Sequence, residues 1–251
     1  MKVSIITVTY NSEKTLKYTL ESVLKQTYKN YEHIIVDGLS KDNTMQIVKK
    51  YETKYNGKLK YISEKDLGLY DAMNKGIKIA TGDIIGILNS DDIYANETVL
   101  EKIVNKFKET KCDATYANLI YMDEETMSKP QRIWNSPEGK LENGWHPAHP
   151  TLYLKKEVYE KIGVFNINYK IAADYDFMIR VMKEKSIKLS YINEYLIYMR
   201  AGGASTAGIK GYIENLKEAN KVLKNNKIKH RYIVNLKRII KTLTEMIKAK
   251  K

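Results

Sequence analysis

Residues 3–37, VSIITVTYNSEKTLKYTLESVLKQTYKNYEHIIVD, contain the pattern from which the fold is predicted. Residues 3–9 are an apolar run typical of a buried strand, and residues 31–36 form a second such run. Between them, apolar residues recur at helical spacing, and Ser12 is placed to cap the helix. A strand, a helix and a second strand of these lengths predict a βαβ unit with parallel strands.

The same alternation continues along the first half of the chain. The pattern predicts strands at residues 59–62 and 84–88, with a helix between them at residues 70–80. A further strand is predicted near residues 114–121. Buried strands that alternate with helices of this length are typical of a parallel sheet covered on both faces. We therefore expect an α/β fold, in which a Rossmann-like, mostly parallel sheet is flanked by helices.

The length and charge of the chain bound its organisation. Its 251 residues are enough for one domain with an appendage, and we expect a domain of residues 1–205 followed by a helical extension of residues 206–251. The formal net charge of +13 implies an anionic partner, which could be nucleic acid, a phosphorylated small molecule or an acidic membrane surface. The single cysteine, Cys112, excludes an internal disulfide and favours a reducing compartment.

The C-terminal extension is basic and amphipathic. Its apolar residues follow helical spacing and include Ile233, Leu236, Ile239, Ile240 and Leu243. From Lys224 onward the basic residues are Lys224, Lys227, Lys229, Arg231, Lys237, Arg238, Lys241, Lys248, Lys250 and Lys251, against the one acid Glu245. This composition predicts contact with an anionic membrane surface, and packing of the apolar stripe on the domain is the open alternative.

The sequence contains neither a membrane span nor a signal peptide. No apolar segment approaches the roughly 20 residues that span a bilayer, and the N-terminal apolar run lacks a small-residue cleavage pattern. We therefore expect a cytoplasmic protein, associated with the inner face of the cell membrane if the extension binds lipid.

Polar side chains follow each of the first four predicted strands at its carboxyl end. They are Thr9, Tyr10 and Asn11 after the first strand, Asp37 after the second, Glu64, Lys65 and Asp66 after the third, and Asn89, Ser90, Asp91 and Asp92 after the fourth. The carboxyl ends of parallel strands share one edge of the sheet, where ligands bind. Taken singly, each residue could be a cap or a turn residue. Together they predict one site, and the adjacent carboxylates Asp91 and Asp92 favour a cation there, because unpaired buried carboxylates are costly.

Four stretches of the sequence, taken in order, resemble the family 2 glycosyltransferases, which have the GT-A fold. They are VSIITVTYNSEKTLKYTLESVLKQTYKNYEHIIVDGLSKDNT, EKDLGLYDAMNKGIKIATGDIIGILNSDD, HPTLYLKKEVYEKIGVFN and AADYDFMIRV, and the resemblance spans roughly residues 1–205. It implies an inverting transfer of a sugar from a nucleotide-diphospho sugar to a glycan or lipid-linked glycan acceptor, as in polysaccharide biosynthesis. The identity of the sugar does not follow from it.

The resemblance also implies a divalent cation, Mn²⁺ or Mg²⁺, which neutralises the nucleotide diphosphate as it leaves. Asp92 is the preferred metal ligand, and Asp91 either shares the metal or binds the ribose. Asn89 stands where many family members have an aspartate, so this position adds no charge.

The nucleotide is expected to be UDP. The resemblance places Thr9 and Tyr10 against a uracil-like ring and makes Asp37 the acceptor of the ring N–H, which cytosine lacks. The other residues expected in the nucleotide pocket are Asn11, Lys65 and Asp66, although Lys65 and Asp66 could also be a solvated charge pair.

The general base is expected to be Asp174, which opens a helix in the stretch AADYDF. A base is needed because an acceptor hydroxyl is a poor nucleophile until its proton is removed. Asp174 could instead cap the helix. Asp176 is grouped with the acceptor and donor side of the site, and we expect it to pack against or cap the same helix.

Two loops supply the remaining candidates. The stretch WHPAHP contains His146 and His149, and His149 is the better candidate for the acceptor side, with a solvated histidine as the alternative. The stretch MRAGGASTAG contains Arg200 and Ser205, which could reach a phosphate, and Arg200 could instead form a structural ion pair.

Two other classes of protein remain open. A sugar-phosphate nucleotidyltransferase would also bind a nucleotide and a metal at this edge of the sheet, but TVTYNSEKT after the first strand lacks a glycine-rich phosphate loop. A basic module for single-stranded nucleic acid would suit the net charge and the 20 tyrosines. The strand-end carboxylates would repel its phosphate backbone, so we expect no nucleic-acid partner.

Overall fold

The computed structural model describes residues 1–202 and 208–249. The strands are β1 (Val3–Thr9), β2 (Tyr31–Asp37), β3 (Leu59–Ser63), β4 (Ile84–Ile87), β5 (Ile93–Tyr94), β6 (Ala114–Met122), β7 (Pro130–Trp134), β8 (Tyr153–Lys155) and β9 (Leu189–Arg200). The α-helices are α1 (Leu16–Leu24), α2 (Thr44–Glu52), α3 (Leu69–Ile79), α4 (Val99–Thr110), α5 (Lys156–Ile162), α6 (Ala173–Lys183), α7 (Gly208–Asn225) and α8 (Arg231–Ala249). Short 3₁₀ turns are η1 (Thr53–Tyr55), η2 (Leu141–Asn143) and η3 (His149–Thr151).

One sheet runs through the molecule in the order β3-β2-β1-β4-β8-β6-β9-β5, and β7 pairs with β6 outside this path. Strands β3, β2, β1 and β4 are parallel, as the alternation of strands and helices predicted. Strand β8 is antiparallel to both β4 and β6, and β9 is parallel to β6. The parallel half therefore brings the carboxyl ends of four strands to one edge.

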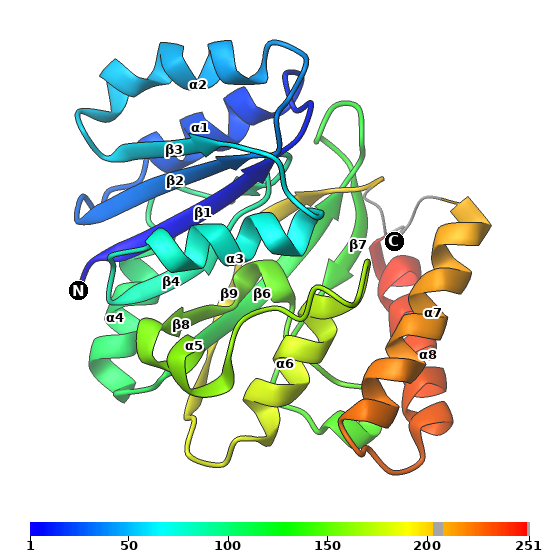
Figure 1. Ribbon diagram of the computed structural model, residues 1–251. Coiled ribbons are helices and arrows are strands. Elements are labelled where there is room, and N and C mark those ends of the chain that lie inside the picture. Colours follow the sequence, from blue (N-terminus) through cyan, green and yellow to red (C-terminus); the bar gives the residue numbers. More distant parts are fainter. Residues whose placement is uncertain (203–207, 250–251) are drawn as a thin grey trace.

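Helices cover both faces of the sheet (Figure 1). Along β1, Val3 and Ile5 belong to a core shared with α1, α2 and α4, whereas Ile6 and Val8 belong to a core shared with α3, α5 and α6. This alternation follows from the two-residue period of a strand. Both faces of the central strands are buried from solvent, which explains their continuous apolar runs.

The predicted cap of α1 is wrong. The helix begins at Leu16, and the Ser12 side chain forms no capping hydrogen bond. The Ser12 hydroxyl lies 2.9 Å from the Ser90 hydroxyl at the end of β4, so this residue joins two strand ends.

The two C-terminal helices lie side by side next to α6 and β7 (Figure 1). Their inner faces supply Ala219, Val222, Leu223 and Val234 to the core. Arg132 on β7 and Glu245 on α8 form an ion pair of 2.7 Å. Between residues 1 and 202 and between 208 and 249, no helix has the length and apolar character needed to cross a membrane.

Candidate active site

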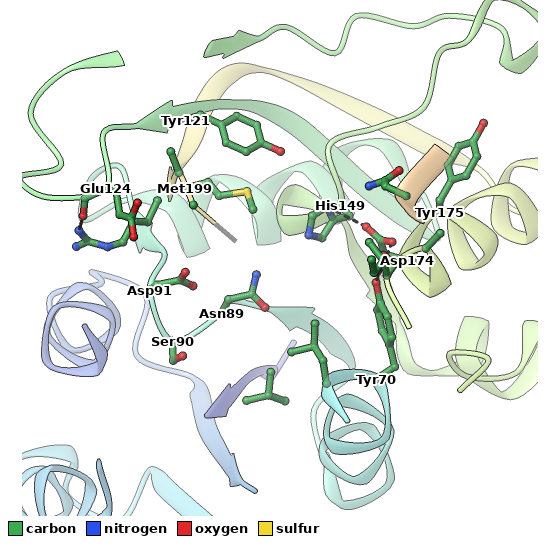
Figure 2. A pocket seen from close by; sticks show the side chains of 18 of the residues that line it. Tyr70, Asn89, Ser90, Asp91, Tyr121, Glu124, His149, Asp174, Tyr175 and Met199 are labelled. Carbon is green, nitrogen blue, oxygen red and sulfur yellow. Dashed lines mark hydrogen bonds and ion pairs between the residues drawn. The ribbon is translucent and has the colours of Figure 1, made fainter. Parts of the chain in front are cut away.

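A cavity of about 940 Å³ opens at the carboxyl ends of the parallel strands. Figure 2 shows Asn89, Ser90 and Asp91 on one side of it, and Tyr70, His149 and Asp174 on the other. Residues of α7 and α8 complete the wall beside Asp174, namely Tyr212, Asn215, Leu216, Arg238, Ile239 and Thr242. The cavity therefore has an acidic side, after β4, and a side that carries Asp174. We call the latter the base side.

On the acidic side, the two adjacent carboxylates occupy different environments. Asp91 lines the cavity, whereas Asp92 is fully buried beneath it. The Asp92 carboxylate accepts hydrogen bonds from the Asn89 amide (3.1 Å) and from the Arg200 backbone N–H (3.2 Å). Burial, with the negative charge of Asp91, raises the Asp92 pKa well above its usual range, and burial also raises the Asp91 pKa. The preference for Asp92 over Asp91 as metal ligand is therefore not supported, because only Asp91 faces the cavity.

A divalent cation suits the atoms on this side. Among the described residues, the Asn89 Oδ1 atom is buried without a hydrogen-bond partner, and Asp91, two positions further along the chain, lines the same cavity. In nucleotide sites Mg²⁺ takes one or two protein oxygens and completes its shell with phosphate and water. The described residues contain no group of three or more His, Cys, Asp or Glu side chains placed so that they could hold a metal ion by themselves. A metal held here would thus depend on nucleotide phosphates for further ligands.

The predicted nucleobase residues lie near one another beside the cavity. Thr9 is buried, while Tyr10 is 61% exposed at the end of β1. Gly38 brings Tyr10 and Asp66 together, since a Cβ at Gly38 would lie 2.4 Å from Asp66 Oδ2 and 3.5 Å from the Tyr10 ring. Lys65 is exposed, and its carbonyl accepts a hydrogen bond from Lys75.

Asp37 is fully buried and does not line the cavity. Its carboxylate accepts hydrogen bonds from the hydroxyls of Ser63 (2.6 Å), Ser40 (2.5 Å) and Thr9 (3.1 Å). The Ser40 backbone N–H donates to it as well, at 3.1 Å. The structure therefore supplies Asp37 with donors of its own, and contact with a base remains a prediction.

On the base side, Asp174 is held by two neighbours. His149 Nδ1 lies 3.3 Å from one carboxylate oxygen, and the Tyr70 hydroxyl lies 3.1 Å from the other (Figure 2). Burial lowers the His149 pKa although the charge of Asp174 opposes this, so the imidazole is largely neutral near pH 7. Asp174 thus faces the cavity with a largely neutral imidazole against one of its oxygens, in a position where its carboxylate can act as a general base.

The backbone before Asp174 is held from α7. The Glu218 carboxylate accepts hydrogen bonds from the backbone N–H groups of Lys170, Ile171 and Ala172, at 2.8–2.9 Å. The Tyr70 hydroxyl also lies 2.6 Å from the Ile171 carbonyl. Helix α6, which carries Asp174, is therefore positioned by both α7 and α3.

The structure separates the remaining candidates. Arg200, at the end of β9, lines the cavity near Asp91. Asn11, which follows β1, also lines the cavity. Asp176 does not line the cavity, because its carboxylate bonds Arg180 (2.9 Å) and the Asn226 amide (2.8 Å). Its placement on the acceptor and donor side is therefore wrong, and its expected packing function is correct. Gly203 and Ser205 lie outside the described residues.

Sequence reasoning missed three residues on the base side: Tyr70, Glu218 and Arg238. Tyr70 lies in the quoted stretch EKDLGLYDAMNKG, but nothing in the helical period of that stretch marks it as facing Asp174. Glu218 and Arg238 lie in the extension, where Glu218 was not singled out and Arg238 was counted among the basic residues of the predicted membrane face. Only the packing of α7 and α8 brings Arg238 to the cavity and Glu218 to the segment before α6.

Comparison with known proteins gives a consistent result. The model of glycosyl transferase family 2 matches residues 4–185. The chain is 28% identical over 206 residues to a PGL/p-HBAD biosynthesis glycosyltransferase of Mycobacterium bovis, covering 80% of this chain and 78% of that protein. It is 31% identical to an uncharacterized glycosyltransferase of Rickettsia prowazekii, covering 81% and 65% of the two chains.

Two solved structures share the fold. Residues 1–349 of S. aureus TarS, in complex with UDP-GlcNAc, superpose with a TM-score of 0.68 at 24% identity, covering 93% of this chain and 69% of that one. The mannosyltransferase PcManGT from Pyrobaculum calidifontis, in complex with GDP-Man and Mn²⁺, gives a TM-score of 0.69 at 16% identity, covering 98% and 73%.

Proposed function

Since this chain belongs to glycosyl transferase family 2 and is a glycosyltransferase with the GT-A fold, we propose that it transfers a sugar from UDP to a glycan or lipid-linked glycan with inversion at the anomeric carbon. The observation that carries the proposal is the arrangement of Asp174 across one cavity from Asp91. A base and a nucleotide-phosphate site on opposite sides of a cavity suit attack from the side opposite the leaving group.

In this mechanism Asp174 takes the proton of the acceptor hydroxyl while the hydroxyl oxygen bonds to the anomeric carbon. The bond from that carbon to the diphosphate oxygen breaks, and UDP leaves on the acidic side. His149 and Tyr70 keep the carboxylate oriented during the proton transfer. Arg200 lies where it can contact the diphosphate.

A Mn²⁺ or Mg²⁺ ion bound at Asp91 would neutralise charge on the departing UDP. Asp92 and Asn89 would support that site from beneath, through the hydrogen bond between them. The preference for UDP rests on the surface formed by Tyr10, Gly38 and Asp66, and on the carboxylate of Asp37. A ring imide could reach Asp37 by replacing one of the hydroxyl donors.

We place the acceptor's membrane on the outer side of α8. Five apolar side chains there are 52–60% exposed and follow one helical stripe: Ile233, Leu236, Ile240, Leu243 and Ile247. The same helix carries the exposed Lys237 and Lys248, and its inner face lines the cavity. An anionic lipid surface would match both the stripe and the charge, and a lipid-linked acceptor would then lie close to the base side.

The substitution Asp174→Asn tests the proposal. It keeps the size of the side chain but removes the ability to take a proton, so we expect turnover to fall by about 10²–10⁴-fold with UDP affinity nearly unchanged. Asp176→Asn is the matched control, since it lies two residues along the same helix and faces away from the cavity. NMR of the product from a UDP-α-sugar should show a β linkage. Full activity in Asp174→Asn, or an α-linked product, would contradict the mechanism.

A further inference from the structure

We propose that the base side of the cavity contains an anion subsite centred on Arg238, which binds a phosphate or carboxylate group of the acceptor itself. The inference rests on the proposed function, because it concerns the acceptor of that same reaction. It assigns the acceptor to a chemical class, namely sugars that carry an oxyanion close to the attacking hydroxyl.

Arg238 is a half-buried cation without a carboxylate partner among the described residues. Its guanidinium donates a hydrogen bond to Asn215 Oδ1 (3.2 Å) and lies 4.7 Å from the Tyr175 ring centroid. Burial lowers its pKa, which the charge of Asp174 only partly opposes. A neutral amide and an aromatic face compensate a partly buried charge less well than a carboxylate does. An oxyanion bound in the cavity would supply the negative partner that the guanidinium lacks.

The other two arginines near α6 and β7 do have such partners. Arg132 pairs with Glu245 at 2.7 Å, and Arg180 pairs with Asp176 at 2.9 Å. Neither is therefore free to hold a ligand without breaking an ion pair. Arg132 also lines the cavity, but among the described residues Arg238 differs from both in bonding only a neutral group.

The charge around Arg238 is positive. The His146 pKa is lowered well below its usual range by burial and then by the positive charges of Arg238, Lys241 and Arg132. Three cations therefore lie near one buried imidazole. Glu245 is the acid on α8 next to them, and Arg132 already pairs with it. Asp174 acts on Arg238 as well, so three cations face two carboxylates here, and one additional negative group would bring this region close to neutrality.

The same region is short of hydrogen-bond acceptors. The His146 ring lies 5.1 Å from the rings of both Trp134 and Tyr175. The indole N–H of Trp134 and the hydroxyl of Tyr175 are buried and have no hydrogen-bond partner in the described chain. Donors without acceptors favour a ligand that supplies oxygen atoms.

The position of Arg238 indicates the acceptor more than the donor. Tyr175, beneath the guanidinium, follows Asp174 directly on α6, and both lie on the base side (Figure 2). The donor diphosphate is proposed at Asp91 and Arg200, on the acidic side. An oxyanion at Arg238 would therefore belong to the molecule whose hydroxyl meets Asp174, either on the same sugar or on the adjoining group.

Binding of small anions tests the subsite without requiring transfer. The protein has two tryptophans, and Trp134 lines the cavity, so tryptophan fluorescence can follow a titration in the presence of UDP and Mg²⁺. The probes are methyl phosphate, methyl β-glucuronide and the neutral methyl β-glucoside. We expect saturable binding of at least one anion and none of the glucoside. The stronger anion distinguishes a phosphate-bearing acceptor from a uronic acid.

Arg238→Gln should weaken binding of that anion at least about tenfold, the usual effect of losing a hydrogen-bonded charge, while UDP affinity changes less than about twofold. Lys237→Gln is the matched control, because it removes one charge from the adjacent, exposed position of α8. Arg238→Lys should lose affinity several-fold, since it keeps the charge but not the planar fork, and it decides the question if the Gln variant does not fold.

Three results would overturn the inference: equal anion binding by wild type and both Arg238 variants, saturable binding of the neutral glucoside with the same affinity, or an equal loss of UDP affinity. The last result would place Arg238 on the donor. None of them bears on Asp174→Asn, so failure of the subsite and failure of the proposed mechanism remain distinguishable.

Discussion

Asp91 and Asp92 are neighbours in sequence, yet the turn after β4 gives them unequal access to the cavity. We expect UDP to bind more tightly with Mn²⁺ or Mg²⁺ than after chelation, and Asp91→Asn to remove most of that difference. Asp92→Asn should have a smaller direct effect, because its carboxylate bonds only Asn89 and the Arg200 backbone. Calorimetric titration of UDP with and without EDTA measures both. If the metal-dependent gain in UDP affinity survives Asp91→Asn and disappears in Asp92→Asn, Asp92 is the metal ligand, as expected from the sequence.

His33 makes stability depend on pH. It is fully buried, with its ring nitrogens 2.9 Å from the Thr7 hydroxyl and 2.8 Å from the Tyr55 hydroxyl. Burial lowers its pKa to about 3, below the unfolded value of 6.5. Between these values the unfolded chain binds the proton and the folded chain does not. The stabilisation that the neutral His33 contributes is therefore fully present above about pH 6.5 and is lost as the pH falls toward about 3.

The urea midpoint should accordingly decrease between pH 6.5 and 5, where most carboxylates are still ionised. His33→Gln should reduce the pH dependence of the free energy of unfolding by up to about 1.4 kcal/mol per pH unit, which is the slope that one bound proton produces. His146 and His149, whose pKa values are also lowered by burial, account for the remaining slope. An NMR titration that gives His33 a midpoint near pH 6.5 would contradict this explanation.

Residue types at strand ends can be predicted from sequence, but their orientation cannot. Asp91 was identified because a strand ends just before it, and Asp174 because the stretch AADYDF, which opens a helix, resembles the catalytic motif of the family. Whether Asp37 faces a ligand or three serine and threonine hydroxyls depends on side chains from β1, β2 and β3 together. Arg238 lies 64 positions after Asp174, and only tertiary packing shows that the two share a cavity.

At the level of elements, we expect α7 to affect catalysis through Glu218. This carboxylate accepts three backbone hydrogen bonds from the segment before α6. Glu218→Gln removes the negative charge that accepts these three hydrogen bonds. We therefore expect turnover to fall at least about tenfold while UDP affinity stays unchanged. Glu214→Gln, one turn earlier on the exposed face of α7, is the control. Equal turnover in the two variants would show that α7 contributes only to stability.

Five of the strands followed from the sequence, whereas the short strands and the 12-residue β9 did not. Strands β1 to β4 and β6 were predicted within one or two residues, because each is a distinct apolar run. Strands β5 and β8 have two and three residues, too few to show a period of two. Their pairing with β9 and with β4 and β6 sets the second half of the sheet, so its topology could not be read from local pattern.

At the scale of the whole molecule, α8 should bind vesicles. We expect sedimentation with phosphatidylglycerol vesicles but not with phosphatidylcholine, weakening as salt is raised. Leu243→Asn should reduce binding about five- to tenfold, since the side chain is 53% exposed and would bury its remaining apolar surface in lipid. Ile167→Asn, 47% exposed outside the two helices, is the control. Equal losses in the two variants would argue against a membrane face on α8.

The order of strands in the sheet has a consequence for biosynthesis. Tyr94 on β5 pairs with Ile197 on β9, so β5 stays unpaired while the ribosome adds about a hundred residues, roughly 5–20 s of elongation. The β9 terminus also supplies the Arg200 N–H to Asp92. Strands β1 to β4 can associate early, but the turn with the two aspartates cannot be fixed until translation is nearly complete. We therefore expect a nascent chain arrested before residue 200 to need chaperone protection and to lack a working donor site.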